Sequence, residues 1–389
     1  MILGRDVSGG PSARAAHPRA GSAGAGTAKE HPRDATQAAK GAATLRTKRT
    51  TGASASLARR GDAHGGAHSV RRSSGHFNTS GTDRIKPGAG VSVGADRPGA
   101  RILTLNIHKL VPASKKRTDA TETTAALHDT AAWIRKKDPD VVVLQEIDDD
   151  RSRPGKKGVN EQLRRLARLI NADGASMAAG SRNKDGDLYD NAIMTRNGFK
   201  LRQNHAVDLP DKEYDRDRAL GAAGVRTPDG QDLTVLYTHT TTRGNSNKDL
   251  QDQLDAIGEA TRTIRATGKL RYEDSVTGES RVARNLSRDN VVLAGDFNAL
   301  APRVYDSIGR DTLRDVADDP QILADPTRAR AASAPSHKDR RIDHIFTAPG
   351  MQVSNAFVED VTANEVKDDG VTDHRGVIAD VLLAPPEAS

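Results

Sequence analysis

The 389-residue sequence contains no cysteine. The chain therefore has no disulfide framework, no thiolate metal site and no cysteine nucleophile. This absence fits a reducing compartment and does not exclude secretion. No apolar run is long enough to cross a membrane, and Met1, Ile2 and Leu3 are followed at once by Gly, Arg and Asp, unlike a signal peptide. We expect a protein without a membrane span that is cytoplasmic or secreted by an unrecognised route.

The positive charge of the chain is unevenly distributed. The formal charge at pH 7 is +7. Residues 1–100 hold 16 Lys and Arg against 6 Asp and Glu, or +10, whereas residues 101–389 hold 43 against 46, or −3. An inference of nucleic-acid binding from overall charge would therefore depend on the first segment alone.

The first segment also differs from the rest in composition. Residues 1–97 are rich in Gly, Ala, Ser, Arg and His, and Phe77 is their only aromatic residue. So little apolar surface cannot offset the entropy of ordering, which predicts a disordered basic arm. The arm could bind nucleic acid or another anionic surface, or serve as a targeting leader. A solvated linker, or a start codon placed too far upstream, is the simpler interpretation, and we favour it.

The rest of the chain, residues 98–385, alternates apolar runs with amphipathic segments and is long enough for a substantial core. This interleaving predicts a single α/β (α+β) domain with a mixed sheet. The Pro-Asp-Gly at 228–230 predicts a hairpin turn, and the polar runs 267–290 and 300–338 are expected to be loops. The expected strands are 102–105, 140–144, 191–195, 222–227, 233–239, 291–294, 341–346 and 376–383, and the expected helices are 127–137, 163–170 and 250–264.

The stretch 291–299, VVLAGDFNA, is the most informative of these. Its apolar residues run into Gly295, which predicts a buried strand that stops at a turn. Asp296 and Asn298 then emerge two positions apart, on the same side of an extended chain. Such a pair can order a water or a metal and bond a phosphate oxygen. For an Asp-x-Asn alone, an Asx turn that caps the strand is the simpler interpretation.

Polar side chains recur where the expected strands end. Each has an ordinary explanation alone: Asn106 as a turn residue, His239 as a satisfied core histidine, Asp373 and His374 as a surface pair. These explanations do not account for all of them in one chain. The set consists of Asn106, Glu146, His239, Asp296, Asn298, Asp343, Asp373 and His374, with His108 as a site neighbour.

Seven short motifs occur in a fixed order along this part of the chain. They are LTLNIH (103–108), PDVVVLQEI (139–147), NAIMTR (191–196), VLYTH (235–239), VVLAGDFNA (291–299), RIDHIF (341–346) and TDHR (372–375). Together they resemble the endonuclease/exonuclease/phosphatase superfamily, the DNase I-like fold, over about residues 100–385. The resemblance implies two packed β-sheets flanked by helices, with the site at one edge of the sandwich.

The resemblance also implies a metal. Glu146 matches the principal Mg²⁺ ligand, Asn106 its companion in the metal-side network, and Asp373 a residue near the ion. Oxygen ligands of this kind favour a hard divalent cation. We expect Mg²⁺, with Mn²⁺ as an alternative.

Catalytic roles follow from the same resemblance. Asp296 would orient or deprotonate the attacking water, and Asn298 would bond a non-bridging phosphate oxygen. His239 would contact the phosphate or protonate the leaving oxygen. His374 would be a base or a phosphate donor, held in one tautomer by Asp343.

The chain departs from the family pattern at four positions. Thr240 and Gly376 stand where many relatives carry Leu and Pro. Ile147 after the Gln-Glu pair, and His108 in place of an acid, are unlike the abasic-site repair branch. A histidine at position 108 is more similar to the pattern of small-substrate and lipid-phosphodiesterase relatives.

We therefore expect a Mg²⁺-dependent phosphoesterase that acts on a phosphodiester or phosphomonoester, with a small-molecule or lipid phosphate favoured over nucleic acid. An endo- or exonuclease aided by the basic arm is the alternative, and a non-enzymatic binding module is a third. We expect a monomer. Residues 267–290 could shape specificity or be a plain insertion.

Overall fold

The computed structural model describes residues 99–110, 120–148, 161–178, 189–210, 218–242, 247–273, 279–361 and 372–385. All of them belong to the second of two compact units, His68–Ser389. The predicted arm, residues 1–97, lies outside the described residues. Its boundary with the catalytic domain at residue 98 stays a prediction.

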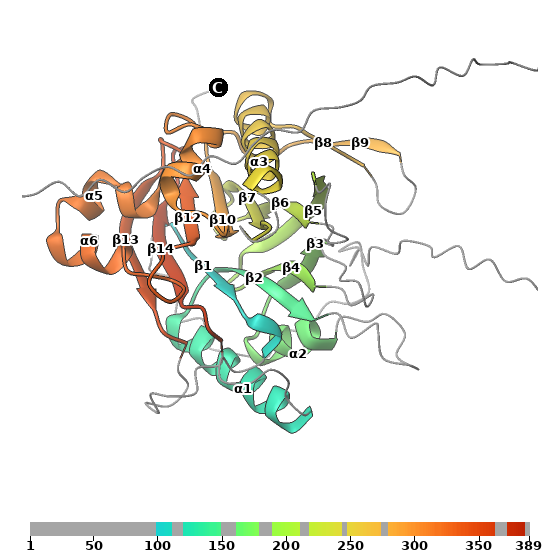
Figure 1. Cartoon of the computed structure of the whole chain (residues 1–389). Coiled ribbons are helices and arrows are strands. Elements are labelled where there is room, and N and C mark those ends of the chain that lie inside the picture. The colour runs from blue at the N-terminus through green and yellow to red at the C-terminus, as the bar shows by residue number, and fades with distance from the viewer. Residues whose placement is uncertain are drawn as a thin grey trace, which may run out of the picture. The chain divides into compact units, whose positions relative to one another are not determined.

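Two six-stranded sheets form the body of the domain. The first contains β1 (Ala100–Asn106), β2 (Val141–Asp148), β3 (Gly174–Ala178), β4 (Tyr189–Thr195), β13 (Gln352–Glu359) and β14 (Gly376–Leu382). The second contains β5 (Lys200–Leu209), β6 (Arg218–Arg226), β7 (Asp232–His239), β10 (Val291–Asp296), β11 (Arg314–Asp315) and β12 (Asp343–Thr347). Their strand orders are β13-β14-β1-β2-β4-β3 and β11-β12-β10-β7-β6-β5 (Figure 1).

The helices lie outside the two sheets. The helical elements are α1 (Ala120–Lys137), α2 (Glu161–Leu169), α3 (Asn247–Thr267), α4 (Ala301–Ile308), α5 (Pro320–Leu323) and α6 (Pro326–Ala332), with the short 3-10 turns η1 (His108–Leu110) and η2 (Val316–Asp318). In Figure 1, α1 and α2 lie beside the first sheet, and α3 and α4 beside the second. The predicted sandwich flanked by helices is confirmed.

Alternate residues of the central strands explain this layering. Val141 and Val143 of β2 belong to the apolar core shared with the second sheet. Val142 and Leu144 point the other way and pack in the cluster formed with α1 and α2. Successive side chains of a strand point to opposite faces, so a continuous apolar run buries both faces of its sheet.

The strand directions bring the polar strand ends to one edge. Strand β1 pairs parallel with β2, and β7 pairs parallel with β10. Strand β12 runs antiparallel to β10, and β14 antiparallel to β1. The carboxyl ends of the first four strands therefore share an edge with the amino ends of β12 and β14. This is why Asp343, the first residue of β12, and His374, which precedes β14, join the residues that end β1, β7 and β10.

The expectation that the strand stops at Gly295 is wrong. Strand β10 continues through Gly295 to Asp296, with Gly295 opposite Thr238 of β7. Gly295 has φ 152°, and a Cβ there would lie 2.1 Å from the Thr238 carbonyl oxygen. Glycine is required because the neighbouring backbone approaches too closely for any side chain.

The two expected loops contain regular structure. The run 267–290 forms a hairpin of β8 (Leu270–Glu273) and β9 (Ser280–Ala283). The run 300–338 contains α4, β11, η2, α5 and α6. Short helices with Pro at their first turns, such as α5 and α6, have too few residues to show a helical period. Both loop predictions are therefore corrected.

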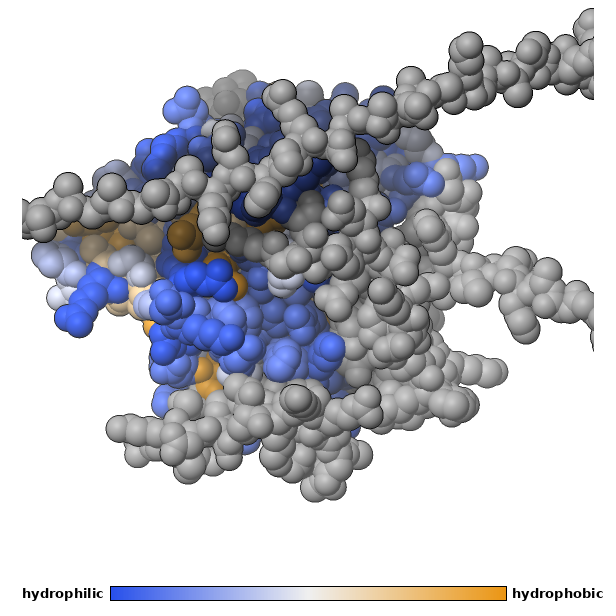
Figure 2. Space-filling model, in the orientation of Figure 1, coloured by the Kyte–Doolittle hydropathy of each residue, from blue (hydrophilic) through white to orange (hydrophobic). Residues whose placement is uncertain are grey.

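The surface shows no strong apolar feature in its described part. The exposed large apolar residues there are Val282, Leu300 and Leu323, which lie on three separate elements or turns. Figure 2 shows a mostly hydrophilic described face, with the apolar colour gathered near α5 and α6. Among the described residues, no helix is both long and apolar enough to span a membrane.

Candidate active site

Asp296 lies at the centre of the polar edge. Its side chain is buried, and its Oδ2 accepts a hydrogen bond from Asn106 Nδ2 at 3.1 Å. Its Oδ1 accepts from the backbone N of Asn298 at 2.9 Å, which is the Asx turn expected as the simpler interpretation. Asn298 has φ 46°, and its Nδ2 donates to Thr240 O at 3.0 Å. The turn and the site coexist, because the turn leaves Asp296 Oδ2 facing the first sheet.

His239 lies beside Asp296 because β7 and β10 are in parallel register. The two residues are paired directly across the strands. His239 Nε2 lies 3.5 Å from Asp296 Oδ2 and 4.0 Å from Glu146 Oε1. His239 is thus placed between a residue of its own sheet and one of the opposite sheet.

Glu146 reaches the edge through a β-bulge. The pairing of β2 with β4 shifts register between Leu144 and Ile147, and Glu146 has φ 55°. A bulge re-aims a side chain, and a non-glycine residue at positive φ is held there by its surroundings. Glu146 therefore lies within β2 rather than after it, a correction to the sequence-based strand of 140–144.

His374 is held by Asp343, as the sequence predicts. His374 Nδ1 donates to Asp343 Oδ2 at 2.8 Å, and the other ring nitrogen, Nε2, lies 3.8 Å from Asp296 Oδ2. Asp343 is itself fixed, because its backbone N donates to Ser336 Oγ at 3.0 Å. The bond at Nδ1 sets the tautomer and leaves Nε2 facing the centre of the site.

Two pKa values in this cluster are strongly displaced. Burial, together with the nearby charge of Asp343, raises the pKa of Asp296 to about 7, although His374 opposes the shift. Burial disfavours the charged form of His374, but the charge and hydrogen bond of Asp343 outweigh it and raise the His374 pKa to about 10. At neutral pH the cluster therefore contains an imidazolium at His374 and, at Asp296, a carboxyl group close to half protonated.

Asp373 and His108 complete the open side of the edge. Asp373 Oδ1 has no hydrogen-bond partner among the described residues, and it lies 3.8 Å from His108 Nδ1. His108 and the next two residues all have positive φ, between 42° and 59°. Thr372 Oγ1 ties this side to β1 by donating to Asn106 O at 2.8 Å. His108 therefore lies beside Asp373, and its role as a site neighbour stays a prediction.

The oxygen donors suit a hard divalent cation. Glu146, Asn106 and Asp373 offer two carboxylates and an amide oxygen on the same edge. Asp373 Oδ1 accepts no hydrogen bond from the described residues and lies 3.8 Å from His108 Nδ1 and 4.0 Å from His374 Nε2. Asn106 and Glu146 both adjoin the Asp296–His239 pair, whereas Asp373 adjoins His374 at 4.0 Å.

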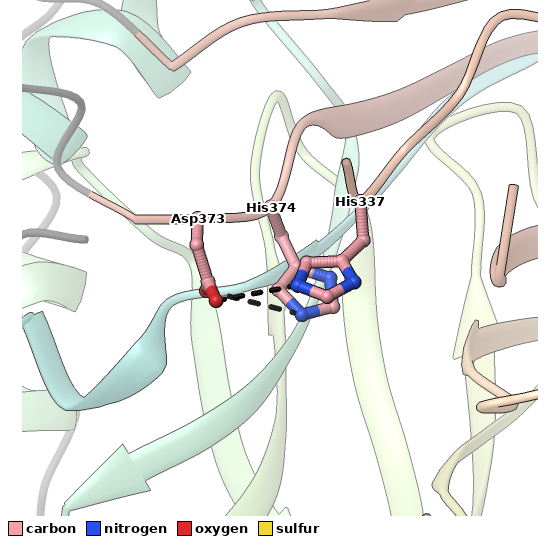
Figure 3. Close-up of side chains that lie close together, drawn as sticks. All are labelled: His337, Asp373 and His374. Atoms are coloured by element: carbon pink, nitrogen blue, oxygen red, sulfur yellow. Dashed lines mark ion pairs between the residues drawn. The ribbon is translucent and has the colours of Figure 1, made fainter. Parts of the chain in front are cut away.

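His337 is a site residue that the sequence patterns did not reveal. Its ring stacks on that of His374, and its Nε2 lies 3.3 Å from Asp373 Oδ2 (Figure 3). It lies between α6 and β12, away from any strand end. A β-bridge between residues 337 and 374 brings it to the site. No period or motif around His337 marks it, so only the tertiary structure identifies it.

A buried ionic network supports the site from behind. Arg341 donates from Nη1 and Nη2 to the two carboxylate oxygens of Asp315, both at 2.7 Å. His344 Nδ1 lies 2.7 Å from Asp315 Oδ2, and its Nε2 donates to Ala299 O at 3.0 Å. This network links β12 to the turn after β10, because His344 follows Asp343 and bonds the carbonyl of Ala299, the residue after Asn298.

Replacing Asp315 with asparagine is expected to lower the free energy of unfolding by ~3–5 kcal/mol. The neutral amide would leave the Arg341 guanidinium, whose side chain is only 11% exposed, without its counter-charge. Urea denaturation followed by circular dichroism would measure the loss. Exposed Asp311 provides the matched control, and Asp311→Asn should change stability by less than about 0.5 kcal/mol. A loss below about 1 kcal/mol for Asp315→Asn would mean that this network contributes no more to stability than a surface ion pair does.

Sequence comparison places the chain in a family. The profile of the Endonuclease/Exonuclease/phosphatase family matches residues 103–374. The protein belongs to this family. All of the predicted site residues lie within the matched range, and members of the family are typically metal-dependent hydrolases. No curated protein matches the sequence.

Solved structures of family members share the fold. An endonuclease/exonuclease/phosphatase from Beutenbergia cavernae is 25% identical, with TM-score 0.52, over 74% of this chain and 72% of that one. The human Nocturnin catalytic domain with bound sulfate is 14% identical, with TM-score 0.52, over 74% and 94%. A Bacteroides vulgatus member is 15% identical, with TM-score 0.52, over 74% and 100%.

Two departures from the family pattern have structural explanations. Gly376, where Pro is frequent, lies under the indole of Trp133, and a Cβ there would approach Trp133 Cη2 to 2.3 Å. Thr240 Oγ1 donates to the Phe297 carbonyl, which links the ends of β7 and β10. Neither residue interrupts the cluster around Asp296.

Ser287, within the insertion at 267–290, lies at the end of the second sheet opposite the site. Thr234 Oγ1, near the start of β7, donates to Ser287 O, and β7 then runs five residues to His239. At the rise of a strand this separates the two by about 16 Å. The plain-insertion alternative therefore agrees better with the structure than a role in specificity.

Proposed function

We propose that this protein is a Mg²⁺-dependent phosphoesterase that hydrolyses a phosphodiester or phosphomonoester by attack of water. The observation that carries the proposal is a buried carboxylate, Asp296, with an imidazole on each side. His239 lies at 3.5 Å and His374 at 3.8 Å from the same oxygen, Oδ2. A carboxyl group between two imidazoles can accept or donate a proton, while the imidazoles lie against the negatively charged phosphate.

Asp296 is suited to orient and deprotonate the attacking water. Its pKa of about 7 matches the operating range of a general base at neutral pH. Asn106 Nδ2 and the backbone N of Asn298 hold its two oxygens. The carboxylate is thus locked in one orientation before substrate binds.

His374 is better suited to donate to the phosphate than to act as a base. With a pKa of about 10, it stays protonated at neutral pH and would present Nε2–H to a phosphate oxygen. Of the two roles implied by the family resemblance, the raised pKa favours the donor. Asp343 neutralises the remaining charge and fixes the ring.

His239 and Asn298 would act on the other phosphate oxygens. His239 lies between Asp296 and Glu146, where it can contact the phosphate and protonate the leaving oxygen. Asn298 Nδ2 uses one hydrogen for Thr240 O and has a second to offer a non-bridging oxygen.

Glu146, Asn106 and Asp373 would hold the divalent cation. When bound, Mg²⁺ would supply Lewis-acid charge against the phosphate, and Mn²⁺ is the alternative ion. The chain's own residues orient the water, bind the oxygens and move the proton.

We favour a small-molecule or lipid phosphate as substrate. Residues 101–389, which contain the whole site, carry a formal charge of −3. Proteins that bind duplex nucleic acid neutralise many phosphates with Lys and Arg, and this part of the chain has no such surplus.

The test is product release with Mg²⁺ across plasmid DNA, RNA, sphingomyelin, phosphoinositides, sugar phosphates and bis-nitrophenyl phosphate. Asp296→Ala should remove turnover of whichever substrate is cleaved. Asp306→Ala, an exposed acid on α4, is the matched control and should match the wild type. Turnover of plasmid alone would favour the nuclease alternative, with steep salt dependence and weaker binding after removal of residues 1–97. Turnover that survives Asp296→Ala would overturn the proposed chemistry.

A further inference from the structure

His337 is held in the site by its backbone. The carbonyl of His337 accepts from Arg340 N at 3.0 Å, which closes a tight turn in which Lys338 has φ 52°. On the neighbouring segment, Arg375 N donates to Ser336 O at 2.7 Å. These main-chain bonds set residue 337 beside residue 374 whatever the two side chains are. Position 337 is thus a built part of the site.

The ring of His337 covers one face of His374. The ring centroids are 4.5 Å apart, and the planes differ by 20° (Figure 3). The hydrogen bond from His374 Nδ1 to Asp343 fixes one atom of that ring but leaves rotation about the bond. A flat ring packed against the face removes this freedom, so that Nε2 stays directed toward Asp296.

The two ring nitrogens of His337 have different surroundings. Nε2 faces Asp373 Oδ2 at 3.3 Å, whereas Nδ1 is buried and has no hydrogen-bond partner among the described residues. A hydrogen on Nδ1 would be buried without an acceptor, so the geometry fits the neutral ring with its hydrogen on Nε2. This tautomer donates to Asp373.

Asp373 has two oxygens with different surroundings. Oδ2 faces His337, whereas Oδ1 has no hydrogen-bond partner among the described residues and is the oxygen that fits a cation ligand. A donor on one oxygen of a ligating carboxylate fixes the direction of the other. His337 would therefore orient the metal-side carboxylate with its Nε2–H and the phosphate-side imidazole with its ring face.

We propose that His337 is a positioning residue that orients Asp373 through Nε2–H and His374 through ring stacking. The inference rests on the proposed phosphoesterase function. In this role His337 would act through Asp373 and His374, without touching the substrate or the reacting oxygens. Its two contacts have different effects, so they can be separated by substitution.

Two variants of the full-length chain separate the contacts. His337→Phe keeps a flat ring against His374 but removes the donor to Asp373. His337→Gln keeps a donor and removes the ring. The readouts are Mn²⁺ affinity by electron paramagnetic resonance, the Mg²⁺ concentration for half-maximal activity, and kcat and KM for bis-nitrophenyl phosphate or the substrate found in the panel.

We expect His337→Phe to weaken Mn²⁺ binding and raise the half-activating Mg²⁺ concentration by at least about 10-fold, as for other partners of metal ligands. We expect His337→Gln to bind Mn²⁺ within about 3-fold of the wild type but to lose kcat by about 10-fold or more, with KM little changed. If His337 had only a structural role, one variant would not lose mainly Mn²⁺ affinity while the other lost mainly kcat.

Unchanged Mn²⁺ affinity in His337→Phe, or unchanged kcat in His337→Gln, would overturn the inference while leaving the proposed function intact. Equal losses of both readouts in both variants, in step with a lower melting temperature, would also overturn it. If the wild type cleaves no substrate in the panel, the proposed function fails, and the Mn²⁺ affinities alone then decide the orientation of Asp373 by His337.

Discussion

Replacing Glu146 with glutamine is expected to reduce Mg²⁺-dependent turnover by more than about 100-fold, because even partners of metal ligands cost 10–100-fold when changed. The amide keeps the size of the side chain but loses the charge that a divalent cation requires. The bulge that presents Glu146 is made by the backbone of β2, so the substitution should leave the fold intact. The measurement is kcat against Mg²⁺ concentration, with circular dichroism as the check on folding.

Exposed Glu259 on α3 provides the matched control for this charge change. Glu259→Gln should retain wild-type activity. Full activity of Glu146→Gln with Mg²⁺ would remove Glu146 from the metal site. A loss reversed by raising Mg²⁺ tenfold or more would instead indicate weaker metal binding with the chemistry preserved.

Replacing His374 with alanine is expected to reduce kcat by about 10²–10⁴-fold, the usual range for a lost acid–base group or phosphate donor. This corresponds to ~2.7–5.5 kcal/mol of activation free energy. His374 is the charged imidazole closest to Asp296 Oδ2 on the β14 side, at 3.8 Å. Its loss removes positive charge from the site and leaves Asp343 buried without its partner.

The loss should appear in kcat more than in KM if His374 acts on the transition state. His128→Ala, an exposed histidine on α1, is the matched control and should change neither constant. Partial recovery on adding free imidazole would support a direct role of the ring. An unchanged rate would remove His374 from the mechanism.

The strands that the sequence predicted are the inner ones of both sheets. These are β1, β2, β4 and β14 in the first sheet, and β6, β7, β10 and β12 in the second. The strands of these two sheets that sequence reasoning missed, β3, β5, β11 and β13, are their edge strands. An inner strand is buried by neighbours on both sides and shows a continuous apolar run. An edge strand such as β5 (KLRQNHAVDL) is half-exposed and carries polar residues, so its pattern is weak.

The candidate site was predictable as far as it depends on strand ends. Asn106, His239 and Asp296 are the last residues of inner strands, and the parallel pairing within each sheet places the strand ends at one edge. Glu146 was recognised from its motif, but its bulge was not, because a register shift depends on the partner strand β4. Asp343 begins β12 and His374 precedes β14, and only antiparallel pairing brings them to the same edge.

The sequence by itself therefore determined the inner strands, the family and the residue types of the site, because these are written in local apolar runs and short motifs. Only the tertiary structure decided which imidazole meets which carboxylate, the displaced pKa values of Asp296 and His374, and the entry of His337. The physical reason is the distance along the chain between the residues that interact. Burial and ring stacking depend on residues far apart in the chain, such as His337 and His374, which no local pattern connects.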